Sequence, residues 1–120
     1  MATSSVTFFG FALADSMFGE YSGLIARKTL TPDEVREMAE SGALTPCINP
    51  SHSATIDAMR RRYGIDVAIP ATPPRVELTV GSRIVIMGVR GLPRLTDRHE
   101  YTEEEIASAT FSFSEYTVLG

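Results

Sequence analysis

The sequence predicts an α/β (α+β) domain in which helices flank a small mixed β-sheet. The chain has 120 residues, which is enough for one domain and hardly two, so we expect a single domain over residues 1–120. Apolar residues make up 43% of the chain and charged residues 22%, a balance that is typical of a packed globule and argues against disorder. Runs of strand-forming residues alternate with helix starts, which favours a sheet with helices on one or both faces.

Two strands are expected before the first helix. Residues 6–12 are rich in strand-forming side chains and predict a buried strand. A loop containing Gly, Ser and Asp follows at residues 14–23. Residues 24–30 predict a second strand, with Arg27 and Lys28 facing water.

The first helix has a strong start. Thr31 followed by Pro32 and Glu34 forms a capping box with proline at the first helical position, and Gly42 is suited to end the helix. Residues 43–50 are expected to form a loop. A second helix is predicted from Ser51, with Gly64 as its stop.

The second half of the chain predicts a β-hairpin, a helix and a last strand. After a proline-rich connection, residues 75–80 and 83–87 read as two strands joined by a two-residue turn with glycine first. Residues 88–100 are expected to be a loop with three arginines. Thr102 opens another capping box, and residues 111–114 alternate as a strand.

The net charge of −4 excludes a non-specific binder of long nucleic acid. The charge is nevertheless uneven, since residues 60–98 carry eight arginines and three acidic residues. This segment predicts either a local anion site or a solvated, salt-bridged surface. A chain of this size buries only about two thirds of its unfolded surface, so dimerisation would bury more.

The cysteine and histidine content predicts no disulfide and no metal site. Cys47 is the single cysteine, which favours a reducing compartment and a buried structural role for its side chain. One cysteine and two histidines at unrelated spacing form no recognisable metal-binding pattern. The longest apolar run is too short to span a bilayer, so we expect a cytoplasmic protein without membrane contact.

His52 is the most informative candidate for chemistry. It lies in a polar run at a helix start, where free backbone N–H groups and the helix dipole attract phosphate. Ser51, Ser53 and Thr55 add hydroxyl donors. A bound phosphate would favour the protonated imidazole, which could then act as a general acid. The alternative is that Ser51 or Ser53 caps the helix and His52 is an ordinary surface residue.

Three arginines outside the helices are the next candidates. Arg90 and Arg94 flank Gly91-Leu92-Pro93, a partly rigid loop that could aim a guanidinium at phosphate. Arg75 begins the strand predicted after the proline-rich connection. Each of the three could equally form a surface ion pair. Arg60-Arg61-Arg62 is expected to be a solvated helix face paired with Asp57 or Asp66.

Taken together, these segments resemble the viral and bacterial ring nucleases, which are called anti-CRISPR ring nucleases when viruses carry them. The resemblance covers nearly the whole chain and depends on the order and spacing of the segments, since no single motif is specific. The matching segments are Thr31-Pro32-Asp33-Glu34, Ser51-His52-Ser53-Ala54-Thr55, Gly64-Ile65, Arg75-Val76-Glu77-Leu78, Arg90-Gly91-Leu92-Pro93-Arg94-Leu95, Tyr101-Thr102-Glu103-Glu104-Glu105-Ile106 and the aromatic last strand at residues 111–118.

The resemblance implies a C2 homodimer that binds cyclic tetra-adenylate, the second messenger of type III CRISPR defence, across its axis. The implied cleavage needs no metal and no cofactor. The ribose 2′-hydroxyl attacks the neighbouring phosphorus and leaves a 2′,3′-cyclic phosphate. On this basis His52 would protonate the departing 5′-oxygen, Arg94 would stabilise the phosphorane and Asp97 would orient the site. Arg75 would hold the ligand, and Arg90 would bind ligand or replace Arg94 as the catalytic arginine.

Three departures from the family pattern concern the site. Ser51 stands in place of the usual glycine before the histidine, and Asp97 is shorter than the usual glutamate. Ala14 and Ser16 align with a serine and an asparagine of the family's first loop, which makes Ser16 a candidate ligand-binding residue. The missing hydroxyl at Ala14 would remove a ligand contact, weaken turnover or mark a different cyclic nucleotide.

The first functional hypothesis is therefore a ring nuclease that lowers a cyclic oligoadenylate signal, in the host cytoplasm if a virus encodes the chain. The alternative is a sponge that binds a cyclic nucleotide without cutting it. A third class is a dimeric interaction protein with no nucleotide ligand.

Overall fold

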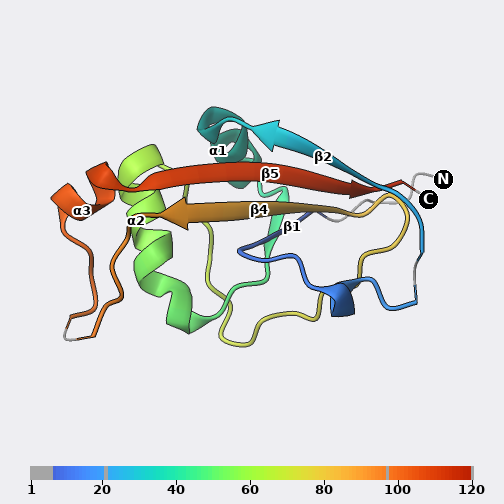
Figure 1. Ribbon diagram of the computed structural model, residues 1–120, viewed down its shortest axis with the longest axis horizontal. Coiled ribbons are helices and arrows are strands. Elements are labelled where there is room, and N and C mark those ends of the chain that lie inside the picture. Colours follow the sequence, from blue (N-terminus) through green and yellow to red (C-terminus); the bar gives the residue numbers. More distant parts are fainter. Residues whose placement is uncertain (1–6, 21, 97, 120) are drawn as a thin grey trace.

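The computed structural model describes residues 7–20, 22–96 and 98–119, and its centre is one five-stranded sheet (Figure 1). The strands are β1 (Thr7–Gly10), β2 (Ile25–Leu30), β3 (Leu44–Pro46), β4 (Arg83–Arg90) and β5 (Thr110–Val118). Their order across the sheet is β2-β5-β4-β1-β3. β1 runs parallel to β3 and β4, whereas β5 pairs antiparallel with β2 and β4. The mixed sheet with helices that the sequence predicts is confirmed.

Three helices and two short 3-10 turns accompany the sheet in the described residues. They are α1 (Pro32–Glu40), α2 (Ser53–Tyr63), α3 (Glu103–Ser108), η1 (Asp15–Met17) and η2 (Pro50–His52). The predicted capping box of α1 is present, because Thr31 Oγ1 accepts from Glu34 N at 3.2 Å and Glu34 Oε1 accepts from Thr31 N at 2.9 Å. Gly64 ends α2 in the left-handed conformation with φ 71°, as predicted. No helix within the described ranges is long and apolar enough to cross a membrane.

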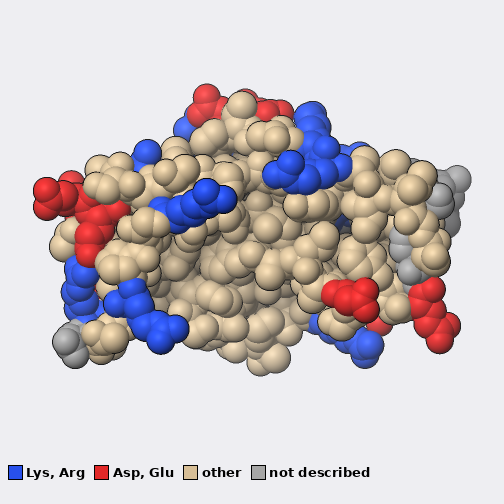
Figure 2. Space-filling model, in the orientation of Figure 1, with Lys and Arg blue, Asp and Glu red and all other residues tan. Residues whose placement is uncertain are grey.

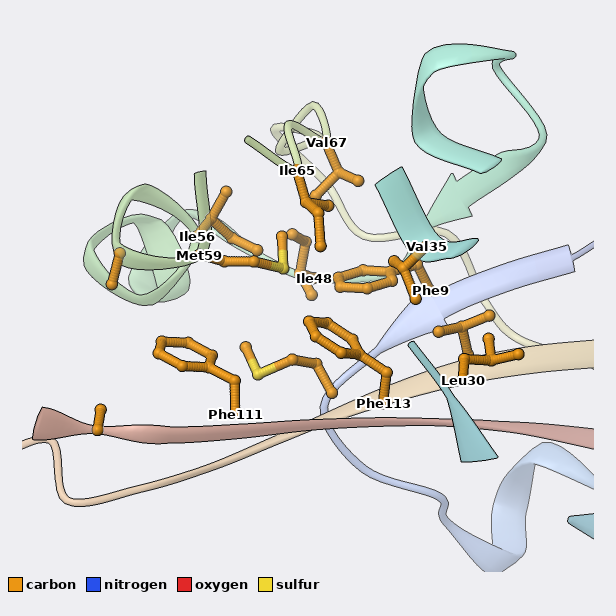
Figure 3. Packing of buried hydrophobic residues seen from close by; sticks show 14 of the residues in the cluster. Phe9, Leu30, Val35, Ile48, Ile56, Met59, Ile65, Val67, Phe111 and Phe113 are labelled. Carbon is orange, nitrogen blue, oxygen red and sulfur yellow. The ribbon is translucent and has the colours of Figure 1, made fainter. Parts of the chain in front are cut away.

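Alternating side chains of the strands form an apolar cluster on each face of the sheet. The helix-face cluster packs Phe9 of β1 and Phe113 of β5 against Val35 of α1 and Met59 of α2 (Figure 3). The opposite-face cluster is smaller, and Leu78 covers it from outside the sheet. Its other members are Ile84 and Val118, with Phe8, Met17, Phe18, Cys47, Val76, Ile86 and Tyr116 packed against them. The helices therefore cover one face, and irregular segments cover part of the other.

The predicted strand at residues 75–80 is wrong, and with it the predicted hairpin. β4 already has β5 on one edge and β1 on the other, so no edge remains for another strand. Residues 75–80 instead cross the opposite face, where Leu78 is buried and its N–H donates to Met17 O at 2.7 Å. The loop predicted over residues 43–50 is also partly wrong, because residues 44–46 form β3 beside β1. β3 was missed because three residues are too few to show the alternation of apolar and polar side chains that identifies a strand.

Candidate functional site

The candidate site lies beyond the end of the sheet at which its three parallel strands finish. Because β1, β3 and β4 run parallel, their carboxyl ends are on the same side of the molecule, which is where α/β sheets commonly bind ligands. The segments that leave these ends are residues 11–14 after β1, 47–52 after β3 and 91–102 after β4. Two of these segments carry the predicted His52 and Arg94.

His52 ends η2, and its imidazole is held from two sides. The ring of Phe11, just after β1, meets the imidazole edge-on, with 4.7 Å between ring centroids and 79° between planes. The backbone N–H of Asn49 donates to Nδ1 at 3.4 Å. With Nδ1 accepting, Nε2 carries the proton of the neutral ring. The side chain is partly buried, so its orientation is set before any ligand binds.

Asn49, which was not among the predicted site residues, organises the start of this turn. Its Oδ1 accepts from Ser51 N at 2.9 Å and also from the Ser51 hydroxyl. The alternative in which Ser51 or Ser53 caps the helix is therefore wrong, because Asn49 is the N-cap of η2, and no described side chain caps the first turn of α2. The Asn49-Pro50 pair was the available signal, because asparagine is a favoured N-cap and proline favours the next position.

The two remaining hydroxyl candidates lie in the first turn of α2. Ser53 is exposed and Thr55 is partly buried. Both lie within three residues of His52 at the start of the helix, and their role in ligand binding stays a prediction.

Ser16 and Arg75 are brought together although 59 positions separate them in the sequence. They line one cavity of ≈ 210 Å³ together with Met17, Phe18 and Leu78. The last three residues belong to or pack against the opposite-face cluster, so this cavity lies on the face of the sheet away from the helices. Arg75 is held loosely, with Nε 3.7 Å from Glu77 Oε1 in an exposed pair.

The structure does not bring His52 into contact with either candidate catalytic arginine. Arg90 is the last residue of β4, and alternation from Ile84 and Ile86 places it on the opposite face of the sheet. Arg94 lies in the loop after β4. Both side chains are exposed, and within residues 7–20, 22–96 and 98–119 neither makes a hydrogen bond or ion pair. Asp97 lies outside the described residues.

The other charged groups are dispersed. In Figure 2 the Lys and Arg side chains form separate groups over the upper part and the ends of the face in view, and the middle of this face is tan. Two arginines of the 60–62 run behave as predicted, because Arg60 and Arg61 pair with Asp57 on α2. This distribution gives no continuous basic surface on that face.

Cys47 has a structural environment. Its thiol donates to Phe9 O at 3.0 Å, and burial raises the pKa of the thiol. A raised pKa keeps the group as a thiol, which is a poor nucleophile. In the described part of the chain, no three His, Cys, Asp or Glu side chains are grouped so that they could hold a metal ion.

Comparisons with known proteins identify the fold and go no further. No family model matches the chain, and no curated protein matches it in sequence. Among solved structures, the chain is similar to B116 of Sulfolobus turreted icosahedral virus, with a TM-score of 0.69 and 20% sequence identity. The match covers 94% of this chain and 99% of B116, so the two share one fold over nearly their full lengths.

Proposed function

We propose that this protein is a metal-independent ring nuclease that binds and cleaves a cyclic oligoadenylate, most simply cyclic tetra-adenylate. The observation that carries the proposal is the fixed imidazole of His52, whose Nδ1 and ring edge are occupied by Asn49 and Phe11. Its Nε2–H is thereby left for a ligand at the start of α2. The sequence resemblance supports this substrate class, and the viral source of B116 supports a role against a defence signal of the host.

The chemistry assigns one proton transfer to His52. A phosphodiester beside the imidazole favours its charged form. In that form Nδ1 also carries a proton, so it no longer accepts from Asn49 N, and the ring keeps its contact with Phe11. The ribose 2′-oxygen attacks the adjacent phosphorus, and its proton passes to water. The bond to the 5′-oxygen then breaks, and that oxygen takes the proton from Nε2. The products are a 5′-hydroxyl and a 2′,3′-cyclic phosphate.

The proposed ligand contacts use two parts of the site. The hydroxyls of Ser53 and Thr55 in the first turn of α2 are suited to donate to one phosphate beside His52. The cavity with Ser16 and Arg75 is suited to a second polar group. At ≈ 210 Å³ it is smaller than typical pockets for small molecules, so one subunit holds only part of a cyclic tetranucleotide. A C2 homodimer would supply each group twice to a twofold ring.

The test is to incubate labelled cyclic tetra-adenylate with the protein in excess chelator and to separate the products. We expect linear di-adenylate ending in a 2′,3′-cyclic phosphate. Replacing His52 by Ala should leave ligand affinity within a few-fold and lower the cleavage rate by about 10²–10⁴-fold, because a positioned general acid contributes that much. His99→Ala is the matched control, since His99 is the chain's other histidine and is exposed. Unchanged turnover in His52→Ala would remove His52 from the mechanism.

The second candidate function is a sponge that retains the cyclic nucleotide intact. One observation favours it: among the described residues, no arginine contacts His52. The same assay separates the two functions, because a sponge returns the uncut ring bound to protein. A ligand-dependent rise in melting temperature without product would support the sponge.

A further inference from the structure

The loop that carries Arg94 is long, and few contacts hold it in one conformation. It joins β4 to α3 over residues 91–102, a length at which irregular loops of compact domains are uncommon and usually functional or disordered. Leu92 near its start and Tyr101 near its end pack against the helix-face cluster. Arg94 is exposed between these two anchors. Apolar packing therefore holds the ends of the loop and leaves its middle to polar contacts.

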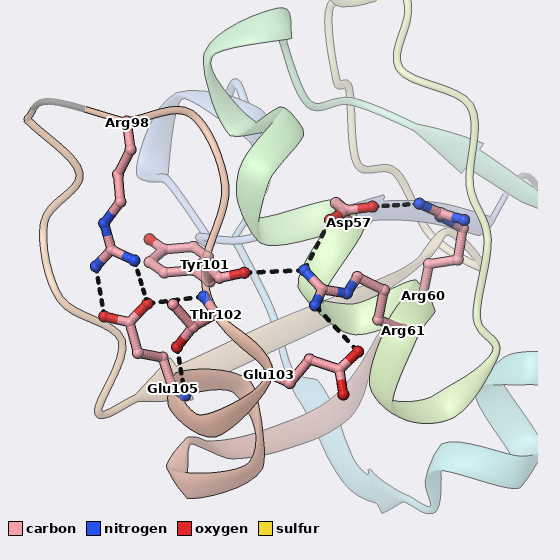
Figure 4. A network of polar contacts seen from close by, with 8 residues as sticks. All are labelled: Asp57, Arg60, Arg61, Arg98, Tyr101, Thr102, Glu103 and Glu105. Atoms are coloured by element: carbon pink, nitrogen blue, oxygen red, sulfur yellow. Dashed lines mark hydrogen bonds and ion pairs between the residues drawn. The ribbon is translucent and has the colours of Figure 1, made fainter.

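Arg98 provides the first polar contact by pairing with Glu105 of α3 (Figure 4). Its Nη1 donates to Glu105 Oε1 at 2.6 Å and its Nη2 to Oε2 at 2.5 Å. Such a two-pronged pair fixes both side chains in a common plane, unlike a single contact between flexible groups. Glu105 is itself fixed, because Oε1 also accepts from Thr102 N at 2.8 Å and its side chain is only 24% exposed.

Arg61 of α2 provides the second polar contact. Its Nη1 donates to the carbonyl of Tyr101 at 2.9 Å, and Asp57 Oδ2 lies 3.4 Å from the same nitrogen. Nη2 lies 3.5 Å from Glu103 Oε1 at the start of α3. The end of the loop is thus attached to the helix that begins directly after His52.

We propose that Arg98, Glu105 and Arg61 form a clamp that positions Arg94 relative to His52. They are positioning residues, which touch no substrate and act through the loop. The inference rests on the proposed function, because it is the cleavage step that requires Arg94 at a defined place. With Leu92 packed on the helix-face cluster and Arg98 paired with Glu105, Arg94 lies between two fixed points of the loop.

The kinetic test compares single and double substitutions with cyclic tetra-adenylate as substrate. Arg98→Ala and Glu105→Gln should each lower kcat by roughly 10–100-fold with little change in KM, because small displacements of a catalytic group cost that much. Arg98→Lys should recover part of the loss. In an Arg94→Ala background, Arg98→Ala should have no further effect, since there is no longer a guanidinium to position.

Arg36→Ala is the matched control. Arg36 donates to Asp33 at 2.7 Å on α1 and to Tyr63 O at 3.2 Å at the end of α2, and its side chain is 39% exposed against 44% for Arg98. Neither of these partners is a candidate site residue or part of the clamp. Arg36→Ala should leave kcat unchanged. Full activity in Arg98→Ala, no effect of Arg94→Ala, or an equal loss from Arg98→Ala with and without Arg94 would each overturn the proposal.

Limited trypsin digestion tests the clamp without using activity. Glu105→Gln retains every arginine, so cleavage after Arg94 should become faster than in the wild type and in Arg36→Ala. An unchanged rate of cleavage would overturn the clamp. The two proposals fail differently, since the proposed function fails when the wild-type protein leaves the ring intact. The clamp fails when the wild type cleaves and the variants match it.

Discussion

At the scale of single residues, the imidazole of His52 is oriented by one neighbour that is distant in the sequence and one that is close to it. Phe11 follows β1, whereas Asn49 lies just before His52 itself. The aromatic contact is worth about 0.5–1.5 kcal/mol beyond the apolar area that it buries. Since the ring is held in the free protein, ligand binding does not have to order it.

Asn49→Ala should weaken the turn that presents His52. The substitution removes the acceptor of the Ser51 N–H, and losing an N-cap costs about 1 kcal/mol in the free energy of unfolding. Urea denaturation followed by circular dichroism measures this loss. Asn49→Asp keeps an acceptor oxygen at the same place and should stay close to the wild type. Equal stability of the Ala and Asp variants would contradict the capping role.

At the scale of secondary-structure elements, the three consecutive arginines of α2 have different roles. Arg60 pairs with Asp57 at the surface, whereas Arg62 reaches α3. Its Nη1 donates to the carbonyls of Ile106 at 2.7 Å and Ala109 at 2.6 Å at the end of α3, where the Ile106 carbonyl also accepts from Ala109 N at 3.2 Å. Arg62 is exposed, as predicted, but its contacts with α3 were not foreseen. Three identical residues in a row do not show which of them meets a neighbouring helix.

Arg62→Ala should destabilise the protein much more than Arg60→Ala. Removing a charged donor from partly buried carbonyls costs about 1.5–3 kcal/mol, whereas an exposed ion pair contributes about 0–1 kcal/mol. Parallel denaturant titrations of the two variants measure the difference. Similar losses in both would show that the contacts of Arg62 with α3 add no more to the free energy of unfolding than an exposed ion pair does.

Glu105, in the first turn of α3, should make the stability of the folded protein depend on pH in the acidic range. Hydrogen bonds from Arg98 and from the Thr102 N–H lower the pKa of Glu105 from 4.5 to about 2. A carboxylate with a lowered pKa in the folded state stabilises the protein above its unfolded pKa, and that stabilisation is lost as the pH falls toward the folded value. Between about pH 4.5 and pH 2, the melting temperature should therefore fall less steeply in Glu105→Gln than in the wild type.

Glu104→Gln is the control for this acid response. Glu104 lies in the same first turn and is exposed, and it forms no ion pair within the described ranges. Its melting curve should follow that of the wild type across the same pH range. A parallel decline in the wild type and Glu105→Gln would show that the Arg98 pair does not carry the effect.

At the scale of the whole molecule, the local signals of the sequence were sufficient for the helices and insufficient for the sheet. Thr31 and Thr102 each start a helix through contacts three residues away, so the sequence contains all the information needed. The place of residues 75–80 depends instead on β1 and β5, which occupy both edges of β4. The same holds for the site: the polar run around His52 was visible, but its contact with Phe11 depends on the fold.

Leu78→Ala should be among the more destabilising substitutions, although residue 78 belongs to no helix or strand. Leu78 is 2% exposed in the opposite-face cluster, and truncating such a leucine costs about 2–5 kcal/mol. Val80 lies two residues further and is 62% exposed, so Val80→Ala should change the free energy of unfolding by less than about 0.5 kcal/mol. Comparable values from chemical denaturation would mean that this segment is not packed on the sheet.

The position of β1 between β3 and β4 has a consequence for how the chain acquires its structure during synthesis. Thr7 is aligned with Leu44 on one side and with Arg83 on the other. During synthesis, β1 therefore acquires its second neighbour only after residues 83–86 of β4 have left the ribosome. Pairings between such remote segments form slowly compared with helical turns. Until then, one side of β1 has no paired strand, and its apolar side chains are exposed. Chaperone binding at that stage would protect the nascent chain from aggregation.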